Sequence, residues 1–203
     1  MIVVGVTGSF GTGKSTVAQL LARRGAHVLN ADALAHEAMA PGTAVARRLR
    51  RRFGAAVVGP DGAIHRAALA RAGFASRRAW QDLCRMIHPA VIVRTRRALR
   101  AIGRRRPRAV VVLDVPLLIE SGMTALVDWV VVVTAPRRVQ LARLRADGRW
   151  PVAEIRRRLR WQMPLAQKVQ RADVVIDNGG SRRATAAQVR QFWMRVHKEI
   201  AHA

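Results

Sequence analysis

The sequence predicts an α/β fold built around a parallel β-sheet. Four short, continuous runs rich in β-branched residues are typical of strands buried on both faces: Ile2 to Thr7, Val110 to Asp114, Trp129 to Thr134 and Val174 to Asp177. A weaker fifth run covers His27 to Asn30. Helical patterns separate these runs, and strands that alternate with helices indicate right-handed βαβ units. We therefore expect three layers, with helices on both faces of a central five-stranded parallel sheet.

The clearest helical patterns follow the predicted strands at Ile2 to Thr7 and at Trp129 to Thr134. Val17, Leu20 and Leu21 have helical spacing within Ser15 to Arg24, and Pro136 to Arg145 shows a similar pattern. Both stretches predict helices that pack an apolar side against the sheet.

Residues 42–108 are too many for a single crossover helix. Their pattern is mostly helical, with a turn signal, GPDG, at 59–62 and an interruption expected at His88-Pro89. We interpret this stretch as a helical insertion in one domain that spans residues 1–203.

A second helical segment covers residues 144–168. It is dense in arginine and is broken by Gly148 and Pro151. We interpret it as a flap on the same domain.

The chain is strongly basic, with a formal net charge of +25, and its 37 Lys and Arg residues are arginines except for Lys14, Lys168 and Lys198. Such charge favours acidic partners such as nucleic acid, anionic membranes or phosphorylated substrates. The arginines fall in scattered runs, for which solvated helix faces are the simpler explanation. With four Phe, five Trp and no Tyr, few aromatic rings are present to stack on bases. Nucleic acid is therefore not an expected partner.

The single cysteine, Cys84, excludes an intramolecular disulfide, and its helical surroundings favour a buried thiol over a nucleophile. No apolar run reaches the length of a transmembrane helix, and the first residues, MIVVGVTG, lack the features of a signal peptide. We expect a cytoplasmic protein without membrane association, and the sequence leaves its oligomeric state open.

A phosphate-binding motif directly follows the first strand. Residues 8–15, GSFGTGKS, match G-x-x-x-x-G-K-[ST] between a predicted strand and a predicted helix, which is the context that this motif requires. Its glycines let backbone amides converge on phosphate oxygens at the positive end of the helix. We expect Lys14 to reach the β- and γ-phosphates of a nucleotide and the Ser15 hydroxyl to ligate Mg²⁺. A merely structural glycine-rich turn is the alternative.

The phosphate motif alone fits a GTPase, another ATPase, a transporter subunit or a small-molecule kinase. GTPases in general read the base with N-K-x-D, and none of the three lysines lies in such an element. That class is therefore disfavoured.

Two aspartates lie at the carboxyl ends of predicted strands. Asp32 comes just after the second strand, where the carboxyl ends of parallel strands border a ligand crevice, and a carboxylate there could deprotonate an attacking hydroxyl. A helix N-cap explains Asp32 equally well. Asp114 ends the apolar run from Val110 and could hold Mg²⁺ directly or through water.

Six stretches, in order along the chain, closely resemble the dephospho-coenzyme A kinase family. They are GSFGTGKST at 8–16, VLNADALAH at 28–36, MIHP at 86–89, LDVPLLIESG at 113–122, LARL at 141–144 and WQMPLAQKVQRADVVIDNGG at 161–180. Related kinases share only the first of these, so the specificity comes from the combination. The resemblance covers nearly the whole chain, through about Gly180.

The resemblance implies an ATP-dependent phosphotransferase that transfers the γ-phosphoryl group to the ribose 3′-hydroxyl of dephospho-coenzyme A. It implies Asp32 as the base and as an acceptor-site residue, Arg143 as the cation that stabilises the transferring phosphoryl, and His88 in the acceptor site. Without the family, a satisfied histidine near a helix start would be the simpler interpretation of His88.

The resemblance also implies the rest of the site. ATP would be bound by Gly11, Thr12, Gly13, Lys14, Ser15, Thr16 and Asn178, with Mg²⁺ at Ser15 and Asp114. Asn178 would lie where family members contact the adenine, although a turn-forming Asn-Gly step is the alternative. Residues 42–108 become the acceptor-binding insertion of a P-loop kinase fold, and residues 144–168 become its lid.

The chain departs from the family pattern in two places. Asn30 stands where the family commonly has another aspartate, which weakens any metal or hydrogen-bonding role of that position. The lid sequence LRADGRWPVAE is about one residue shorter than the usual form and places Arg145 and Arg149 differently, so Arg143 alone is carried over from the lid region.

Two other functions remain as alternatives. A related P-loop kinase of a nucleotide or another small hydroxylated metabolite would use the same fold with a different acceptor pocket. A basic ATP-binding protein that acts on nucleic acid has only the net charge in its favour.

Overall fold

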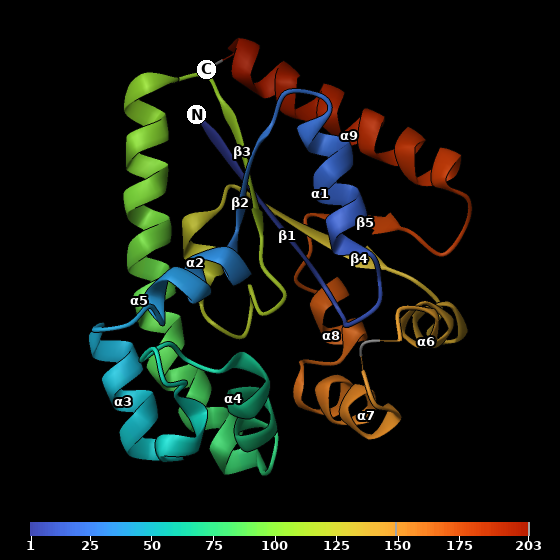
Figure 1. Cartoon of the computed structure of the whole chain (residues 1–203). Helices are drawn as coiled ribbons and strands as arrows, with labels where there is room; N and C mark the ends of the chain where they lie inside the picture. Colours follow the sequence, from blue (N-terminus) through green and yellow to red (C-terminus); the bar gives the residue numbers. More distant parts are fainter. Residues whose placement is uncertain (149, 203) are drawn as a thin grey trace. The chain divides into compact units, whose positions relative to one another are not determined.

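Five parallel strands form one sheet, in the order β2-β3-β1-β4-β5, in the computed structural model of the chain (Figure 1). The structure describes residues 1–148 and 150–202. The strands have the predicted bounds, except that β1 includes Gly8: β1 Ile2–Gly8, β2 His27–Asn30, β3 Val110–Asp114, β4 Trp129–Thr134 and β5 Val174–Asp177. The prediction of an α/β fold with a five-stranded parallel sheet is confirmed.

Helices connect the strands. The α-helices are α1 Lys14–Ala22, α2 Ala31–Ala38, α3 Ala44–Phe53, α4 Arg66–Gly73, α5 Arg77–Arg105, α6 Arg137–Ala146, α7 Val152–Trp161, α8 Leu165–Val169 and α9 Arg182–His202. Two 3₁₀ turns, η1 Ala55–Val57 and η2 Met123–Leu126, lie between them. The two helices predicted after the first and fourth strands correspond to α1 and α6.

The chain forms two compact units. Met1–Asn30 and Leu99–Ala203 make up the first, which contains the sheet, and Ala31–Ala98 makes up the second, which is helical. Helix α5 begins in the second unit and ends in the first.

The main core of the first unit lies between the sheet and two helices that run side by side, α1 and α9 (Figure 1). Side chains alternate along each strand, so every second residue faces this layer. The core is built from Val4, Val6, Val112, Val131, Val133, Val17, Leu21, Val189, Phe192 and Val196, among others. Each side chain of this size contributes about 1.5–3 kcal/mol when it is removed from water.

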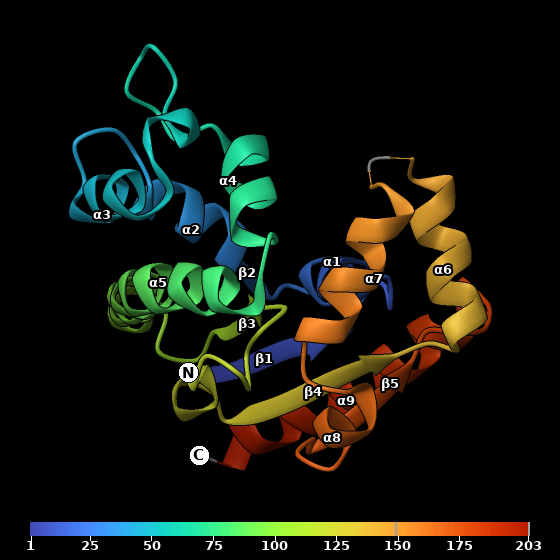
Figure 2. The ribbon, with the colours of Figure 1, turned by 90° about the horizontal axis from the view of Figure 1, so that it is seen from below.

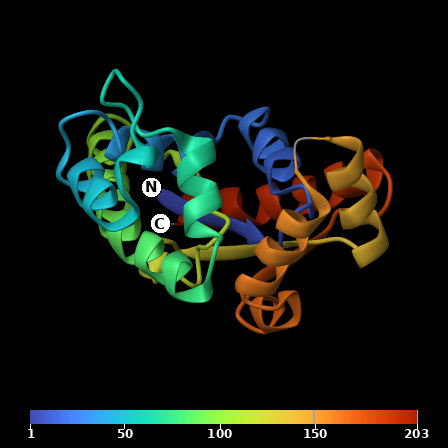
Figure 3. The same ribbon diagram turned by 60° about the horizontal axis from the view of Figure 1, so that its bottom comes forward.

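The second unit has its own apolar core. Helices α3, α4 and the first part of α5 lie together in this unit (Figure 3). Its core includes Leu49, Leu69 and Leu83. The Thr43 side chain caps α3 by accepting a hydrogen bond from the Ala46 amide at 3.1 Å. The predicted turn at 59–62 is confirmed, because Val58 and Ile64 form an antiparallel bridge around it.

One detail of the predicted insertion is wrong. His88 and Pro89 lie inside α5, which continues without a break from Arg77 to Arg105. Proline removes one backbone donor and disfavours a helix interior. Packing of α5 against the core of the second unit, for example through Leu83 and Ala90, offsets this cost.

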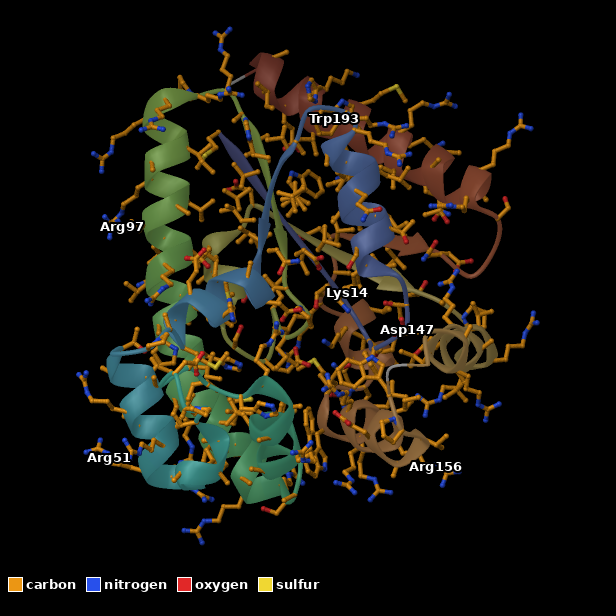
Figure 4. The ribbon with its side chains drawn as sticks, viewed as in Figure 1. Lys14, Arg51, Arg97, Asp147, Arg156 and Trp193 are labelled. Atoms are coloured by element: carbon orange, nitrogen blue, oxygen red, sulfur yellow. The ribbon has the colours of Figure 1, made fainter. Side chains whose placement is uncertain are left out.

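The labelled arginines Arg51, Arg97 and Arg156 extend from the solvent side of α3, α5 and α7, and all three are exposed (Figure 4). Solvated helix faces therefore account for these three arginines, of which Arg51 and Arg156 belong to the runs at 47–52 and 156–160. Among the described residues, every helix is too short or too polar to cross a lipid bilayer.

The parallel register brings the carboxyl ends of three strands together. Asp114, the last residue of β3, lies opposite Val6 of β1 and opposite Asn30, the last residue of β2. The loop that follows β1 therefore starts at the edge of the sheet where β3 ends in a carboxylate, which is where open α/β sheets bind ligands.

Candidate functional site

The loop between β1 and α1 has the backbone conformation that the phosphate motif requires. Gly11 and Gly13 adopt positive φ angles of 82° and 85°, which glycine reaches without a steric penalty. The Thr12 amide and hydroxyl both donate to the Ser9 carbonyl, at 3.2 and 2.9 Å, and this closes the turn. Gly13 precedes α1 and has no side chain to cap it, so the first amides of the helix can face an anion.

Ser15 and Asp114 lie next to each other, although they are far apart in the sequence. The Ser15 hydroxyl donates to Asp114 Oδ2 at 3.4 Å, and Asp114 is only 6% exposed. A hydroxyl and a carboxylate are the oxygen ligands that Mg²⁺ uses in nucleotide sites, where phosphates and water complete its shell. Within residues 1–148 and 150–202, no group of three or more His, Cys, Asp and Glu side chains could hold a metal by itself. The donor set therefore fits a metal that arrives with a nucleotide.

Arg143 projects from α6 to the phosphate loop. Its guanidinium donates to the Thr12 carbonyl at 3.3 Å and to the Asn178 carbonyl at 2.8 Å. The predicted cation therefore lies directly beside the predicted phosphate-binding residues.

Asn178 is 4% exposed, and its side chain is engaged within the protein. The Nδ2 atom donates to the Thr12 carbonyl at 2.8 Å, and Oδ1 accepts from the Thr185 hydroxyl at 3.0 Å. Asn178 thus packs behind the phosphate loop, a contact that the sequence did not reveal.

Residues 144–168, which were predicted to form a flap, also lie near the phosphate loop. Helix α7 follows α6 after a break at Gly148 and Pro151, as predicted, and it lies beside the loop (Figures 2 and 3). Gln162 accepts a hydrogen bond from the Phe10 amide at 3.0 Å. Arg149, one of the two arginines that the short 144–168 sequence places differently from the family pattern, lies outside the described residues.

Aromatic contacts strengthen this docking. The Phe10 ring meets Trp150 edge-on at 5.8 Å, and the Arg158 guanidinium lies 3.8 Å from the Trp150 ring centre and 5.4 Å from that of Phe10. Glu154 holds Arg158 at 2.8 Å. Cation–π contacts of this kind are worth about 0.5–1 kcal/mol when exposed and more when desolvated.

Lys168 is fully buried at the base of the same segment, at 0% exposure. Its ammonium lies 2.9 Å from the Glu120 carboxylate and donates to the Pro116 carbonyl at 2.9 Å. Burial lowers the pKa of Lys168 because it disfavours the charged form, and the negative charge of Glu120 partly offsets this effect. The same Pro116 carbonyl accepts from Thr7, so the pair connects residues 144–168 to the strand that leads into the phosphate loop.

The second unit contains the other two predicted residues. Asp32 is the second residue of α2, exposed and inside the first helical turn rather than at a cap position before it. His88 is half-buried in α5 and not near a helix start.

Comparisons with known proteins extend the resemblance seen in the sequence. A family model described as "Dephospho-CoA kinase" matches residues 2–183. The dephospho-CoA kinase of Moorella thermoacetica is 39% identical over 201 residues, which cover 99% of this chain and 95% of that protein.

Solved structures share the fold. TT1252 from Thermus thermophilus is 35% identical, with a TM-score of 0.77 and 96% of each chain covered. A dephospho-CoA kinase from Campylobacter jejuni is 21% identical, with a TM-score of 0.71, and the match covers 97% of this chain and 98% of that one. At this lower identity the second structure supports the fold alone.

Proposed function

The chain belongs to the dephospho-CoA kinase family, and from this premise we propose how its residues carry out the reaction. The protein is a kinase that uses ATP to phosphorylate dephospho-CoA and so produces CoA. We propose that the accepting group is the ribose 3′-hydroxyl. The observation that most supports the kinase function is the combination of a family match over residues 2–183 with a glycine loop flanked by Asp114 and Arg143.

The phosphate loop, from Gly11 to Thr16, would bind the phosphates of ATP. Its amides and the positive end of α1 attract the phosphate oxygens, and Lys14, the first residue of α1, adds a full positive charge (Figure 4). These groups stabilise negative charge that builds up on the γ-phosphoryl group during transfer.

Ser15 and Asp114 would hold Mg²⁺ together with the nucleotide phosphates. When bound, the ion neutralises phosphate charge. The proximity of the Ser15 hydroxyl to Asp114 Oδ2, at 3.4 Å, supports this assignment.

Arg143 would stabilise the transferring phosphoryl group. Its contact with the Thr12 carbonyl supports this role, because the guanidinium already lies at the loop. Asn178 would contribute to the ATP site mainly by supporting that loop, since both polar atoms of its amide have partners inside the protein.

Asp32 would act as the general base that accepts the proton of the attacking hydroxyl, and His88 would contact the acceptor. An exposed carboxylate just after a strand end supports this role of Asp32. Residues 42–108 would bind the acceptor. Residues 144–168 would form a lid that excludes water, which competes with the acceptor for the phosphoryl group.

The requirement for ATP also indicates where the protein works. We propose that the protein works in the cytoplasm, where its co-substrate ATP is available, with ATP and dephospho-CoA as its small-molecule partners.

An acceptor panel tests the function. ADP release is measured at fixed ATP and Mg²⁺ with dephospho-CoA, with nucleoside monophosphates and with no acceptor. We expect dephospho-CoA to stimulate release far above all others. Release no greater than with water alone would refute the proposal, and stimulation by added polynucleotide would favour a nucleic-acid function instead.

A further inference from the structure

A buried threonine supports the phosphate loop from behind. Thr185 lies in the first turn of α9, outside every motif that pointed to the function, and is 0% exposed. Its hydroxyl lies 3.0 Å from Asn178 Oδ1, and Asn178 Nδ2 lies 2.8 Å from the Thr12 carbonyl. Two hydrogen bonds in series therefore connect α9 to the loop.

The direction of this chain of hydrogen bonds follows from its chemistry. The Thr12 carbonyl can only accept, so it takes the Nδ2 end of the Asn178 side chain, and the Thr185 hydroxyl then donates to the Oδ1 end. If the amide were reversed, its oxygen would face the Thr12 carbonyl and no donor would stand between them. Thr185 thus satisfies the Asn178 oxygen and holds the side-chain amide in the position from which Nδ2 meets the loop.

The Thr12 carbonyl matters because it belongs to the peptide that contains the Gly13 N–H. A trans peptide is planar, so its carbonyl and its N–H point in opposite directions. When Asn178 holds the carbonyl on the outer side of the loop, the Gly13 N–H is directed to the inner side, where phosphate is expected.

Gly13 is also the residue that permits this approach. A Cβ atom at Gly13 would lie 2.1 Å from Asn178 Nδ2 and 3.3 Å from Arg143 Nη1. The glycine of the motif therefore makes room for the supporting amide in addition to providing its own positive φ.

Arg143 depends on the same residue. It donates to the Asn178 backbone carbonyl at 2.8 Å and to the Thr12 carbonyl at 3.3 Å, so a shift of the Thr12–Gly13 peptide changes one of its two contacts. The Asn178 backbone N–H donates to the Thr134 carbonyl at the end of β4, at 2.8 Å, and this fixes the backbone of Asn178 on the sheet.

We propose that Thr185 is a positioning residue for phosphoryl transfer: through the Asn178 side-chain amide it orients the Thr12–Gly13 peptide of the phosphate loop, whose carbonyl the Arg143 guanidinium also contacts. This inference rests on the proposed roles of the loop and of Arg143 in the kinase reaction.

A purely structural role for Thr185 is the competing explanation. Its hydroxyl also lies 3.4 Å from the Ser181 and Asp177 carbonyls, so its single proton could instead stabilise the start of α9. The Asn178 oxygen is the nearest of the three acceptors.

Thr185→Val tests the proposal because valine keeps the shape and removes the hydroxyl. We expect kcat/KM for ATP to fall about tenfold, because the loop amides lose their alignment with the transferring phosphoryl group. The KM for dephospho-CoA should change less than about twofold, because no acceptor contact is altered. Thr185→Ser keeps the hydroxyl and should restore most of the activity.

Gln188→Met is the matched control on α9. Gln188 hydrogen-bonds to the Asp177 backbone N–H and carbonyl, both at 2.9 Å, and so secures the same strand end without touching the loop. We expect this variant to retain kcat/KM for ATP even where its melting temperature falls. An equal kinetic loss in both variants would overturn the proposal in favour of general loosening of α9.

Two measurements without turnover separate this inference from the proposed function. Hydrogen exchange of the free protein should show faster exchange of the loop amides at 12–16 in Thr185→Val than in wild type, and calorimetry should show weaker ATP binding. Unchanged exchange and unchanged ATP affinity would overturn the positioning role. A wild-type protein that binds ATP but does not phosphorylate dephospho-CoA would refute the function instead, and the exchange data would still decide the role of Thr185.

Discussion

Replacement of Lys168 by methionine should destabilise the protein strongly. The ammonium is fully buried, 2.9 Å from Glu120 and 2.9 Å from the Pro116 carbonyl. Methionine has a similar length but no charge, so Lys168→Met removes one partner of a buried ion pair and leaves the other.

The expected magnitude follows from the charge that remains. Loss of one partner of a buried ion pair typically costs about 3–5 kcal/mol, because the other charge stays desolvated. The Glu120 side chain is 18% exposed and still accepts the Met163 amide at 3.0 Å, so we expect the lower end, about 3 kcal/mol. That is a large part of the roughly 5–15 kcal/mol by which native domains are stable.

A second change identifies the cause of the loss. Glu120→Gln in the Lys168→Met background removes the charge that has no partner, and the double variant should recover part of the stability. No recovery would show that the contact with Pro116, not the isolated carboxylate, accounts for the loss.

The same residue predicts a pH dependence. Burial lowers the pKa of Lys168 from its ordinary value of 10.5, so between the lowered pKa and 10.5 the unfolded chain binds more protons than the folded chain. The free energy of unfolding gains a contribution from this group that rises with pH through that window. Lys168→Met should lack this rise.

Urea unfolding followed by circular dichroism measures both effects, at neutral pH and in steps towards pH of about 10. Lys198→Met is the matched control, since Lys198 is an exposed lysine on α9 and its loss should change stability by less than about 0.5 kcal/mol. If Lys168→Met is as stable as Lys198→Met, the buried pair does not stabilise the fold and the reasoning is wrong.

Two predictions concern catalysis. Lys14→Ala should leave the circular dichroism spectrum unchanged and lower kinase turnover at least about a hundredfold, because a charge that stabilises the transferring phosphoryl is lost; undiminished turnover would refute the loop assignment. Asp32→Asn should keep the ATP affinity measured by calorimetry and lower kcat by about 10²–10⁴-fold, as expected when a general base is removed; wild-type kcat would reduce Asp32 to a structural residue of α2.

The sheet was predictable because its signal is local. Strands buried on both faces form continuous β-branched runs, so the bounds of β3 and β4 can be found without knowledge of their neighbours. The bounds of β5 also match the prediction, but its predicted burial on both faces is wrong, because β5 is an edge strand in which Val175 is 43% exposed. Even β2 was found, although its run is short. Only β1 differs at its end, by Gly8.

The continuity of α5 was not predictable from local rules. Pro89 signals an interruption in any isolated stretch. The helix continues because its apolar residues pack on both sides of the proline, for example Leu83 before it and Val91 after it, and both are buried. Tertiary packing here outweighs the local preference.

The site likewise has one part that was predictable from local sequence and one part that was not. Gly11, Gly13, Lys14 and Ser15 belong to one contiguous motif whose chemistry can be inferred from the sequence. The partners that hold the loop lie outside this motif. Gln162 and Asn178 reach the loop only through folding, across 152 residues between Phe10 and Gln162 and 166 between Thr12 and Asn178, and Thr185 contacts Asn178 behind it. Of these, only Asn178 was singled out, and its contact with Thr12 was not foreseen.

The identity of the phosphorylated atom tests the central claim most directly. The protein is incubated with ATP, Mg²⁺ and either dephospho-CoA or its 3′-deoxy analogue, and the products are analysed by mass spectrometry and phosphorus NMR. We expect dephospho-CoA to gain one phosphate as a ribose 3′-monoester, and the analogue to release no more ADP than water alone. A phosphorylated analogue, or a phosphate at any other position of dephospho-CoA, would contradict the account.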